Sequence, residues 1–210
     1  MGSIGNKNYT KAYLEDRLTG LNEVVKILDQ EKIPYRIAAG TLLGFYRDNA
    51  FIPWDNDVDI FFNVDDIYKK KDNLIKIFKK KKFELILTNK ITDYSCFGFR
   101  AIKYGTRYEF SGFHEKGKYM MLLPKWNIGW KYPKDLFNSL STIKFRNYEY
   151  TTFSNIEDFL ILQYGNWKQP KKTRYLTYKV RTNYFNPFIR IVMKVKYFIK
   201  LLKNKVYIQS

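Results

Sequence analysis

The chain has 210 residues, of which 45% are hydrophobic and 19% aromatic, so it can bury a core and is not a disordered polymer. Its 38 lysines and arginines against 20 aspartates and glutamates give a formal net charge of +18, which favours an anionic partner. Cys96 is the single cysteine, which excludes an intrachain disulfide framework and a cysteine-based zinc site. We expect a cytosolic protein without a signal peptide or a membrane-spanning helix.

Helices and strands alternate in the predicted order, which favours an α/β (α+β) domain with a mixed sheet flanked by helices. Leucines and valines at three- and four-residue spacing indicate the first helix, and short apolar runs between turn residues indicate the strands. In chain order we expect a helix at about 10–31, a strand at 33–39, a helix at 40–47, a strand at 57–62, a helix at 64–83, strands at 83–87, 97–104, 108–113, 118–123 and 142–151, and a helix at 154–165.

The C-terminal tail, residues 173–210, is predicted as a basic amphipathic segment outside a catalytic domain at 1–172. No acidic residue follows Asp158. From about Pro187 one arc of a helix would contain seven apolar residues and none of the six basic residues; the apolar residues are Ile191, Val192, Val195, Phe198, Ile199, Leu202 and Val206. Such a helix can lie on an anionic membrane surface, pack on the domain or contact nucleic acid. Membrane contact is the interpretation we favour.

Three aspartates at every second position, Asp55, Asp57 and Asp59, are the candidate metal site. In an extended chain these residues share one face, where their charges repel. A hard divalent cation such as Mg²⁺ or Mn²⁺ removes that repulsion, and carboxylate oxygens are its preferred ligands. The alternative is an aspartate-rich turn capped by its own side chains.

Gly40 and Thr41 form a second candidate element, because they lie at a predicted strand-to-helix turn. Backbone N–H groups at the start of a helix bind phosphate oxygens. A Gly-Thr pair alone is weak evidence, but here it precedes the aspartates by about 15 residues. The Gly-Thr turn would hold phosphate oxygens, and the aspartates would hold the metal ion that bridges those oxygens. This pairing is the outline of nucleotidyltransferase chemistry.

The stretch "AAGTLLGFYRDNAFIPWDNDVDI" at 38–60 resembles the LicD family, whose pattern has Gly-Thr-Leu-Leu-Gly, an Arg, and then Phe-Ile-Pro-Trp-Asp-Asp-Asp-Ile-Asp. A later block, "IKFRNYEYTTFSNIEDFLILQYGNWKQP" at 143–170, is similar to the family less tightly. Together the two blocks frame residues from about 10 to 172. Asn56 departs from the pattern, since the family often has Asp there.

The resemblance implies a nucleotidyltransferase-type fold and a metal-dependent transfer of a phospho-substituent from a CDP-activated donor to a sugar hydroxyl. By position it implies that Gly40 and Thr41 contact the donor phosphate and that Asp57 and Asp59 hold Mg²⁺. Asp55 would be a further metal ligand, a residue that holds the metal ligands in place, or part of the substrate site. Choline, ribitol and glycerol phosphate are all possible transferred groups.

Several further residues have two interpretations. Arg47 either assists catalysis or makes a structural ion pair, and Glu109 is either the third carboxylate, acting as base or ligand, or an exposed strand residue. Tyr164 and Trp167 either line an acceptor pocket or belong to a helix C-cap and the core. Trp54 either packs or stacks on a ligand, and packing is the interpretation we favour.

Three functions remain open from the sequence. The first is an enzyme that decorates a surface glycan or glycolipid, such as lipopolysaccharide or capsule. It would act on a saccharide or lipid-linked saccharide at the cytoplasmic face of the membrane, with no nucleic acid partner. The second is a minimal nucleotidyltransferase acting on nucleic acid or protein. The third is a non-catalytic, glycan-binding pseudoenzyme, because the sequence does not establish that Glu109 supplies the carboxylate from a later strand.

Overall fold

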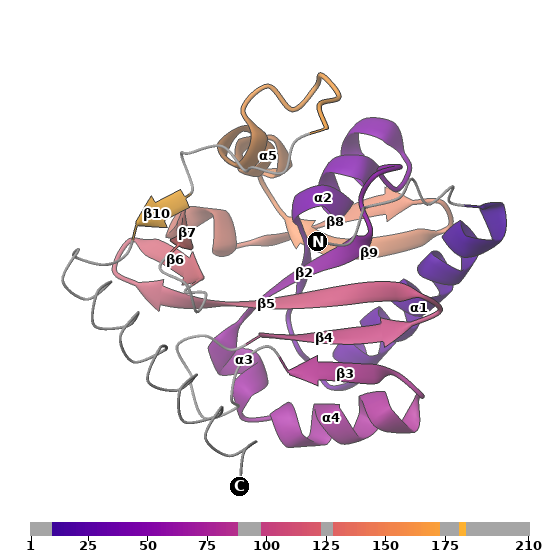
Figure 1. Cartoon of the computed structure of the whole chain (residues 1–210). Coiled ribbons are helices and arrows are strands. Elements are labelled where there is room, and N and C mark those ends of the chain that lie inside the picture. Colours follow the sequence, from indigo (N-terminus) through magenta and orange to yellow (C-terminus); the bar gives the residue numbers. More distant parts are fainter. Residues whose placement is uncertain (1–9, 88–97, 123–127, 173–180, 184–210) are drawn as a thin grey trace, which may run out of the picture.

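The computed structural model describes residues 10–87, 98–122, 128–172 and 181–183. Figure 1 shows a sheet with helices on both of its faces. The α/β class with a mixed sheet, predicted from the sequence, is confirmed. The helices are α1 (Lys11–Gln30), α2 (Ala39–Leu43), α3 (Val64–Tyr68), α4 (Lys71–Lys80) and α5 (Ile156–Tyr164), with a π-helical turn at Gly44–Asp48 and a 3₁₀ turn at Lys134–Phe137.

The main sheet is built around the long strand β5. Its neighbours are parallel β2 on one side and antiparallel β4 on the other, while its C-terminal end pairs with β6. The strands are β1 (Arg36–Ile37), β2 (Asp57–Asn63), β3 (Glu84–Leu87), β4 (Gly98–Lys103), β5 (Thr106–Lys116), β6 (Tyr119–Leu122), β7 (Ile128–Pro133) and β10 (Arg181–Asn183), and a separate hairpin joins β8 (Leu140–Phe145) to β9 (Tyr148–Phe153).

Helices α1 and α4 cover the back face of the sheet. Tyr108 of β5 is buried there, and its hydroxyl donates to the carbonyl of Arg17 at 3.0 Å. Phe78 of α4 packs edge-on against Phe99 and Phe110. Burial of these aromatic groups supplies much of the hydrophobic stabilisation. Because side chains alternate along a strand, the neighbouring residues of β2 and β5 point to the front face.

The front face is divided between a second apolar core and a polar site. Phe61 of β2 contacts Phe153 of the hairpin and Phe159 of α5, so α5 and the hairpin close one end of this face. The Thr152 hydroxyl ties the hairpin to the main sheet by donating to the Ile37 carbonyl at 2.8 Å. The remaining front-face positions, at the start of β2, stay accessible from the solvent side.

Three of the predicted elements differ in the structure. The strand expected at 33–39 is reduced to β1, because Ala39 and Gly40 already belong to α2. The helix expected at 64–83 is two helices, α3 and α4. The strand expected at 142–151 is the hairpin β8–β9, which turns where Arg146 takes a positive φ of 53°. Strand β7 has no counterpart in the prediction.

Within the described ranges, no helix is both long and apolar enough to span a bilayer. The amphipathic helix predicted from about Pro187 lies outside the described residues. Residues 181–183, which the sequence analysis assigns to the tail, pair with β7 as strand β10.

Candidate functional site

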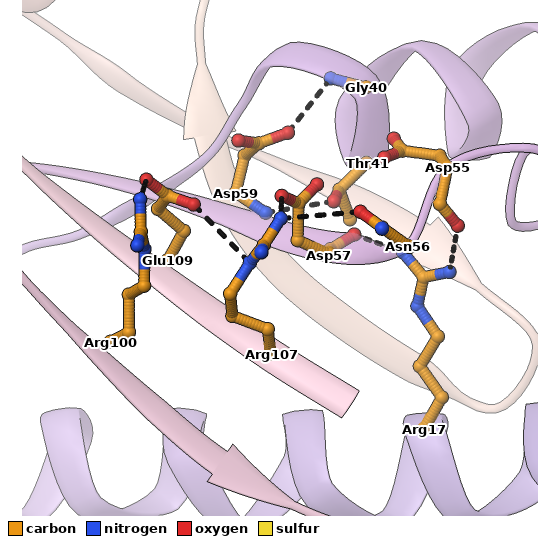
Figure 2. Close-up of polar contacts among 10 residues, drawn as sticks. All are labelled: Arg17, Gly40, Thr41, Asp55, Asn56, Asp57, Asp59, Arg100, Arg107 and Glu109. Atoms are coloured by element: carbon orange, nitrogen blue, oxygen red, sulfur yellow. Dashed lines mark hydrogen bonds and ion pairs between the residues drawn. The ribbon is translucent and has the colours of Figure 1, made fainter. Parts of the chain in front are cut away.

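The three aspartates converge at the start of β2. Asp57 and Asp59 are two residues apart on the strand and so share a face. Asp55 lies in the preceding loop, where its N–H donates to the Ile52 carbonyl at 3.0 Å. One carboxylate oxygen from each aspartate lies within 4.8 Å of the other two. Figure 2 shows Asp57 and Asp59 directed to the same side of the sheet, with the Asp55 carboxylate approaching from the loop. The common face expected from their spacing is therefore formed.

Glu109 joins the aspartates from the neighbouring strand. In the parallel register between β2 and β5, Asp59 is opposite Glu109 and Asp57 is opposite Arg107. Glu109 and Asp59 therefore share the front face, and both line the same cavity. Arg100 of β4 forms an ion pair with Glu109 at 3.0 Å, and Arg107 approaches the same carboxylate at 3.5 Å. Glu109, the candidate for a further carboxylate from a later strand, therefore lies next to the aspartates.

Helix α2 begins directly against the acid cluster. The Gly40 N–H donates to Asp59 Oδ2 at 3.1 Å, and the Asp59 N–H donates to the Thr41 hydroxyl at 3.0 Å. Thr41 is 1% exposed and is absent from the cavity lining, so its side chain ties α2 to β2. A Cβ on Gly40 would lie 2.0 Å from Asp55 Oδ2, so glycine makes room for that carboxylate. Phosphate contact by these residues stays a prediction.

Arg17 of α1 fixes the loop that carries the aspartates. Its side chain is 1% exposed and crosses beneath the site, with the guanidinium 4.2 Å from the centre of the Phe51 ring. It donates to the backbone carbonyl of Asp55 at 2.9 Å and also to that of Asp57. Buried carbonyls need such donors, so Arg17 determines the path of the chain from Asp55 to Asp57.

A cavity of about 510 Å³ opens over these residues. One wall carries the four carboxylates, and the other walls carry aromatic, aliphatic and a few polar side chains. Among the lining residues are Phe61, Trp130, Tyr132, Tyr164 and Trp54, with Arg47 and Lys171 as cationic members. The combination of an acidic wall, aromatic surfaces and a few cations suits a charged ligand that also has apolar or ring-shaped parts.

Burial and the charges of neighbouring carboxylates raise the pKa values of Asp55 and Asp59. Burial, reinforced by the charge of Asp57, raises the pKa of Asp55 to about 7, although Arg17 acts in the opposite direction. Burial also raises the pKa of Asp59 well above its usual value, and the charges of Asp57, Asp55 and Glu109 add to this effect. Perturbed carboxyl groups gathered in a cavity are typical of functional sites.

The donor set fits a divalent cation. Three carboxylate oxygens converge, and the repulsion that helps to raise the pKa values of Asp55 and Asp59 is what a bound cation would offset. Oxygen-only ligands match Mg²⁺ or Mn²⁺ rather than a thiolate- or imidazole-binding metal. Asp55, Asp57 and Asp59 are thus the residues that would hold such an ion.

The other predicted site residues fall into two groups. Arg47 and Tyr164 line the cavity, whereas Trp167 is 8% exposed and packs near Tyr46 with a ring separation of 5.5 Å. Arg47 makes the structural ion pair considered above, through two hydrogen bonds to Asp48 at 2.8 and 2.7 Å. It also donates to the carbonyl of Trp167 at 3.1 Å.

The interpretation of Trp54 as a packing residue is wrong. Its side chain is 42% exposed and lines the cavity, because the loop before β2 directs it away from the core.

Sequence reasoning missed three arginines of the site: Arg17, Arg100 and Arg107. A signal for Arg17 was present, since a charged residue next to Leu18 interrupts the apolar stripe of the first helix. Arg100 and Arg107 had no comparable signal. Arg107 reaches Asp57 through the register of β5 with β2, which pairs residues 50 positions apart, and Arg100 reaches Glu109 through the register of the β4–β5 hairpin, which pairs residues nine positions apart.

Comparison with known proteins agrees with the geometry. Over 46 residues the chain is 37% identical to the lipopolysaccharide cholinephosphotransferase LicD of Haemophilus influenzae, a stretch that covers 22% of this chain and 17% of that protein. A family model described as the LicD/FKTN/FKRP nucleotidyltransferase domain matches residues 32–155, which include the three aspartates and Glu109. The chain therefore belongs to the LicD/FKTN/FKRP nucleotidyltransferase domain family.

Proposed function

We propose that the protein is a divalent-metal-dependent transferase that moves a phospho-substituent from a CDP-activated donor to a sugar hydroxyl of a surface glycan or glycolipid. The observation that carries the proposal is the convergence of Asp55, Asp57, Asp59 and Glu109 on one wall of a cavity, within the matched family domain. The similarity to a lipopolysaccharide cholinephosphotransferase supports the choice of acceptor class.

In the proposed reaction, an acceptor hydroxyl oxygen attacks the β-phosphorus of the donor. A new P–O bond to the sugar forms, the bond between the β-phosphorus and the bridging oxygen breaks, and CMP leaves with that oxygen. Mg²⁺ or Mn²⁺, when bound, offsets charge on the phosphate oxygens. Glu109 accepts the proton of the hydroxyl, and Arg100 and Arg107 hold its carboxylate beside the aspartates.

The rest of the cavity would position the two substrates. Arg47 and Lys171 offer positive charge to the donor phosphates, and Gly40, whose N–H donates to Asp59, lines the same cavity at the start of α2. The aromatic wall that contains Tyr164 suits the apolar faces of a sugar ring or of the transferred group.

The membrane location belongs to the same proposal. A lipid-linked saccharide would present its sugar at the cytoplasmic face, and the basic tail beyond about Pro187 would bring the protein to that surface. Deleting residues 187–210 should abolish sedimentation with anionic vesicles. A truncated protein that still sediments would remove this part of the proposal and leave the transfer reaction untouched.

A thermal-shift panel tests whether the protein binds a CDP-activated donor in a metal-dependent way, which the transfer reaction requires first. CDP-choline, CDP-ribitol, CDP-glycerol, CTP, UDP-glucose and ATP would each be added with and without Mg²⁺, to the wild type and to an Asp57→Ala, Asp59→Ala double variant. A metal-dependent rise in Tm with one CDP compound, lost in the double variant, is the expected result. CMP release on adding acceptor glycolipid would then establish turnover.

The panel also separates the alternatives. No shift with any nucleotide, together with normal function of the double variant in cells, would favour a glycan-binding pseudoenzyme. A shift with ATP or CTP alone, and binding to RNA that weakens steeply with salt, would favour a nucleotidyltransferase acting on nucleic acid.

A further inference from the structure

Arg107 occupies the space between two carboxylates of the site. Its guanidinium pairs with Asp57 through Nη2, and its Nε lies 3.5 Å from Glu109 Oε2. It also donates to the Asn56 side-chain oxygen at 3.2 Å. Figure 2 shows the guanidinium between the Asp57 and Glu109 side chains, with Arg100 on the other side of Glu109.

The sheet register fixes this arrangement. Arg107 and Glu109 are two residues apart on β5, so both point to the front face, and the pairing with β2 sets Arg107 directly opposite Asp57. The backbone of Arg107 is therefore fixed by pairing with β2 on one side and β4 on the other, rather than lying in a loop. Its side chain is 36% exposed, so the guanidinium is partly open to solvent beside the acid cluster and is not in the core.

The charges of the cluster have a consequence for metal binding. Once a bound cation has displaced their protons, the four carboxylates face two paired guanidinium groups, those of Arg100 and Arg107, which leaves an excess of two negative charges. One divalent cation at Asp55, Asp57 and Asp59 neutralises that excess. A second cation between Asp57 and Glu109 would have to displace the Arg107 guanidinium and would lie near the first positive ion.

We infer that Arg107 supplies the second positive charge of the site, so that the protein binds one divalent cation rather than a pair. The inference rests on the metal site of the proposed function and adds the number of metal ions that this site binds. A fixed guanidinium suits this role, since it stays protonated and presents a planar set of donors to carboxylate and phosphate oxygens.

The count of bound Mn²⁺ tests the inference without any turnover. Equilibrium dialysis and electron paramagnetic resonance would be applied to the full chain as wild type, Arg107→Gln, Arg107→Lys and Arg100→Gln. The wild type should bind one Mn²⁺. Arg107→Gln removes the charge beside Asp57 and should bind a second ion, visible as dipolar broadening of the manganese signal. Arg107→Lys restores the charge and should return the count to one.

Arg100→Gln is the matched control, because Arg100 pairs with Glu109 and not with Asp57; it should still bind one ion. Two ions on the wild type, or one ion on a folded Arg107→Gln variant, would overturn the inference while leaving the transferase proposal intact. No bound Mn²⁺ on the wild type would overturn the metal site itself and the inference with it.

Discussion

Gly40 leaves no room for a side chain beneath the Asp55 carboxylate: a Cβ at position 40 would lie 2.0 Å from Asp55 Oδ2 and 3.1 Å from its Cγ. We therefore predict that Gly40→Ala displaces this carboxylate and lowers the affinity for Mn²⁺ by about 10-fold or more, the range found when groups around a metal site are altered. The fold should be retained, because alanine is the better helix former by about 1 kcal/mol. Titration with Mn²⁺ and thermal unfolding measure the two effects.

A double-mutant comparison isolates the cause. In an Asp55→Ala background the clashing carboxylate is gone, so adding Gly40→Ala should change the Mn²⁺ affinity little further. If Gly40→Ala weakened binding equally in both backgrounds, displacement of Asp55 would not be the reason.

Arg17 gives a second prediction, because it holds the loop before β2 through two backbone carbonyls. Arg17→Met keeps most of the buried volume but leaves those carbonyls without their donor. The free energy of unfolding should fall by about 1–3 kcal/mol, the usual cost of unpaired buried polar groups. Mn²⁺ affinity should fall as well, since Asp55 and Asp57 then lose their fixed separation. Urea unfolding and Mn²⁺ titration at low temperature measure these quantities.

Arg17→Lys is the matched variant for this prediction. It retains the positive charge and one donor group, so it should recover part of the stability and part of the affinity. A stable Arg17→Met protein with wild-type Mn²⁺ binding would show that the loop keeps its shape without Arg17.

The two tryptophans Trp54 and Trp167 should respond to substitution in opposite ways. Trp167 is 8% exposed, so Trp167→Ala should lower the free energy of unfolding by about 3 kcal/mol, as removal of a large buried aromatic group does. Trp54 is 42% exposed at the cavity, so Trp54→Ala should change stability much less. If Trp54 stacks on a ring of the donor, its loss should weaken donor binding by about 1–3 kcal/mol, or about 5- to 150-fold.

Calorimetric titration with the CDP compound that binds the wild type would measure the affinities. Equal effects of Trp54→Ala and Trp167→Ala on that affinity would contradict a direct role for Trp54.

The local patterns of the sequence were enough to place the acid cluster. Alternation along a strand predicted that Asp57 and Asp59 share a face, and the apolar spacing of α1 gave that helix nearly to its ends. Thr10 caps it, accepting a hydrogen bond from the Tyr13 N–H at 3.1 Å. Such signals are visible because each depends on residues a few positions apart.

Features that depend on pairing between distant segments could not be read in the same way. The parallel register of β2 with β5 decides that Arg107 meets Asp57, and no local pattern encodes that register. The hairpin after β8 was missed because its turn uses Arg146 and Asn147 instead of a glycine pair. Trp54 was misassigned because burial of an aromatic residue in a loop is decided by tertiary packing.

The raised carboxyl pKa values lead to a prediction with a definite sign. Between the usual carboxyl pKa of about 4 and the folded-state value of about 7 for Asp55, the folded protein binds more protons than the unfolded chain. Protonation of Asp55 therefore stabilises the folded protein at low pH. In EDTA this stabilisation is lost as pH rises, so Tm of the wild type should fall relative to Asp55→Asn between pH 5.5 and 8. Excess Mg²⁺ should act in the opposite direction, since it must displace those protons: its Tm increment should grow with pH in the wild type and be small in Asp55→Asn. Differential scanning fluorimetry across this range measures both, and a Mg²⁺ increment that is equal at pH 5.5 and 8 would show that Asp55 is not protonated in the metal-free site.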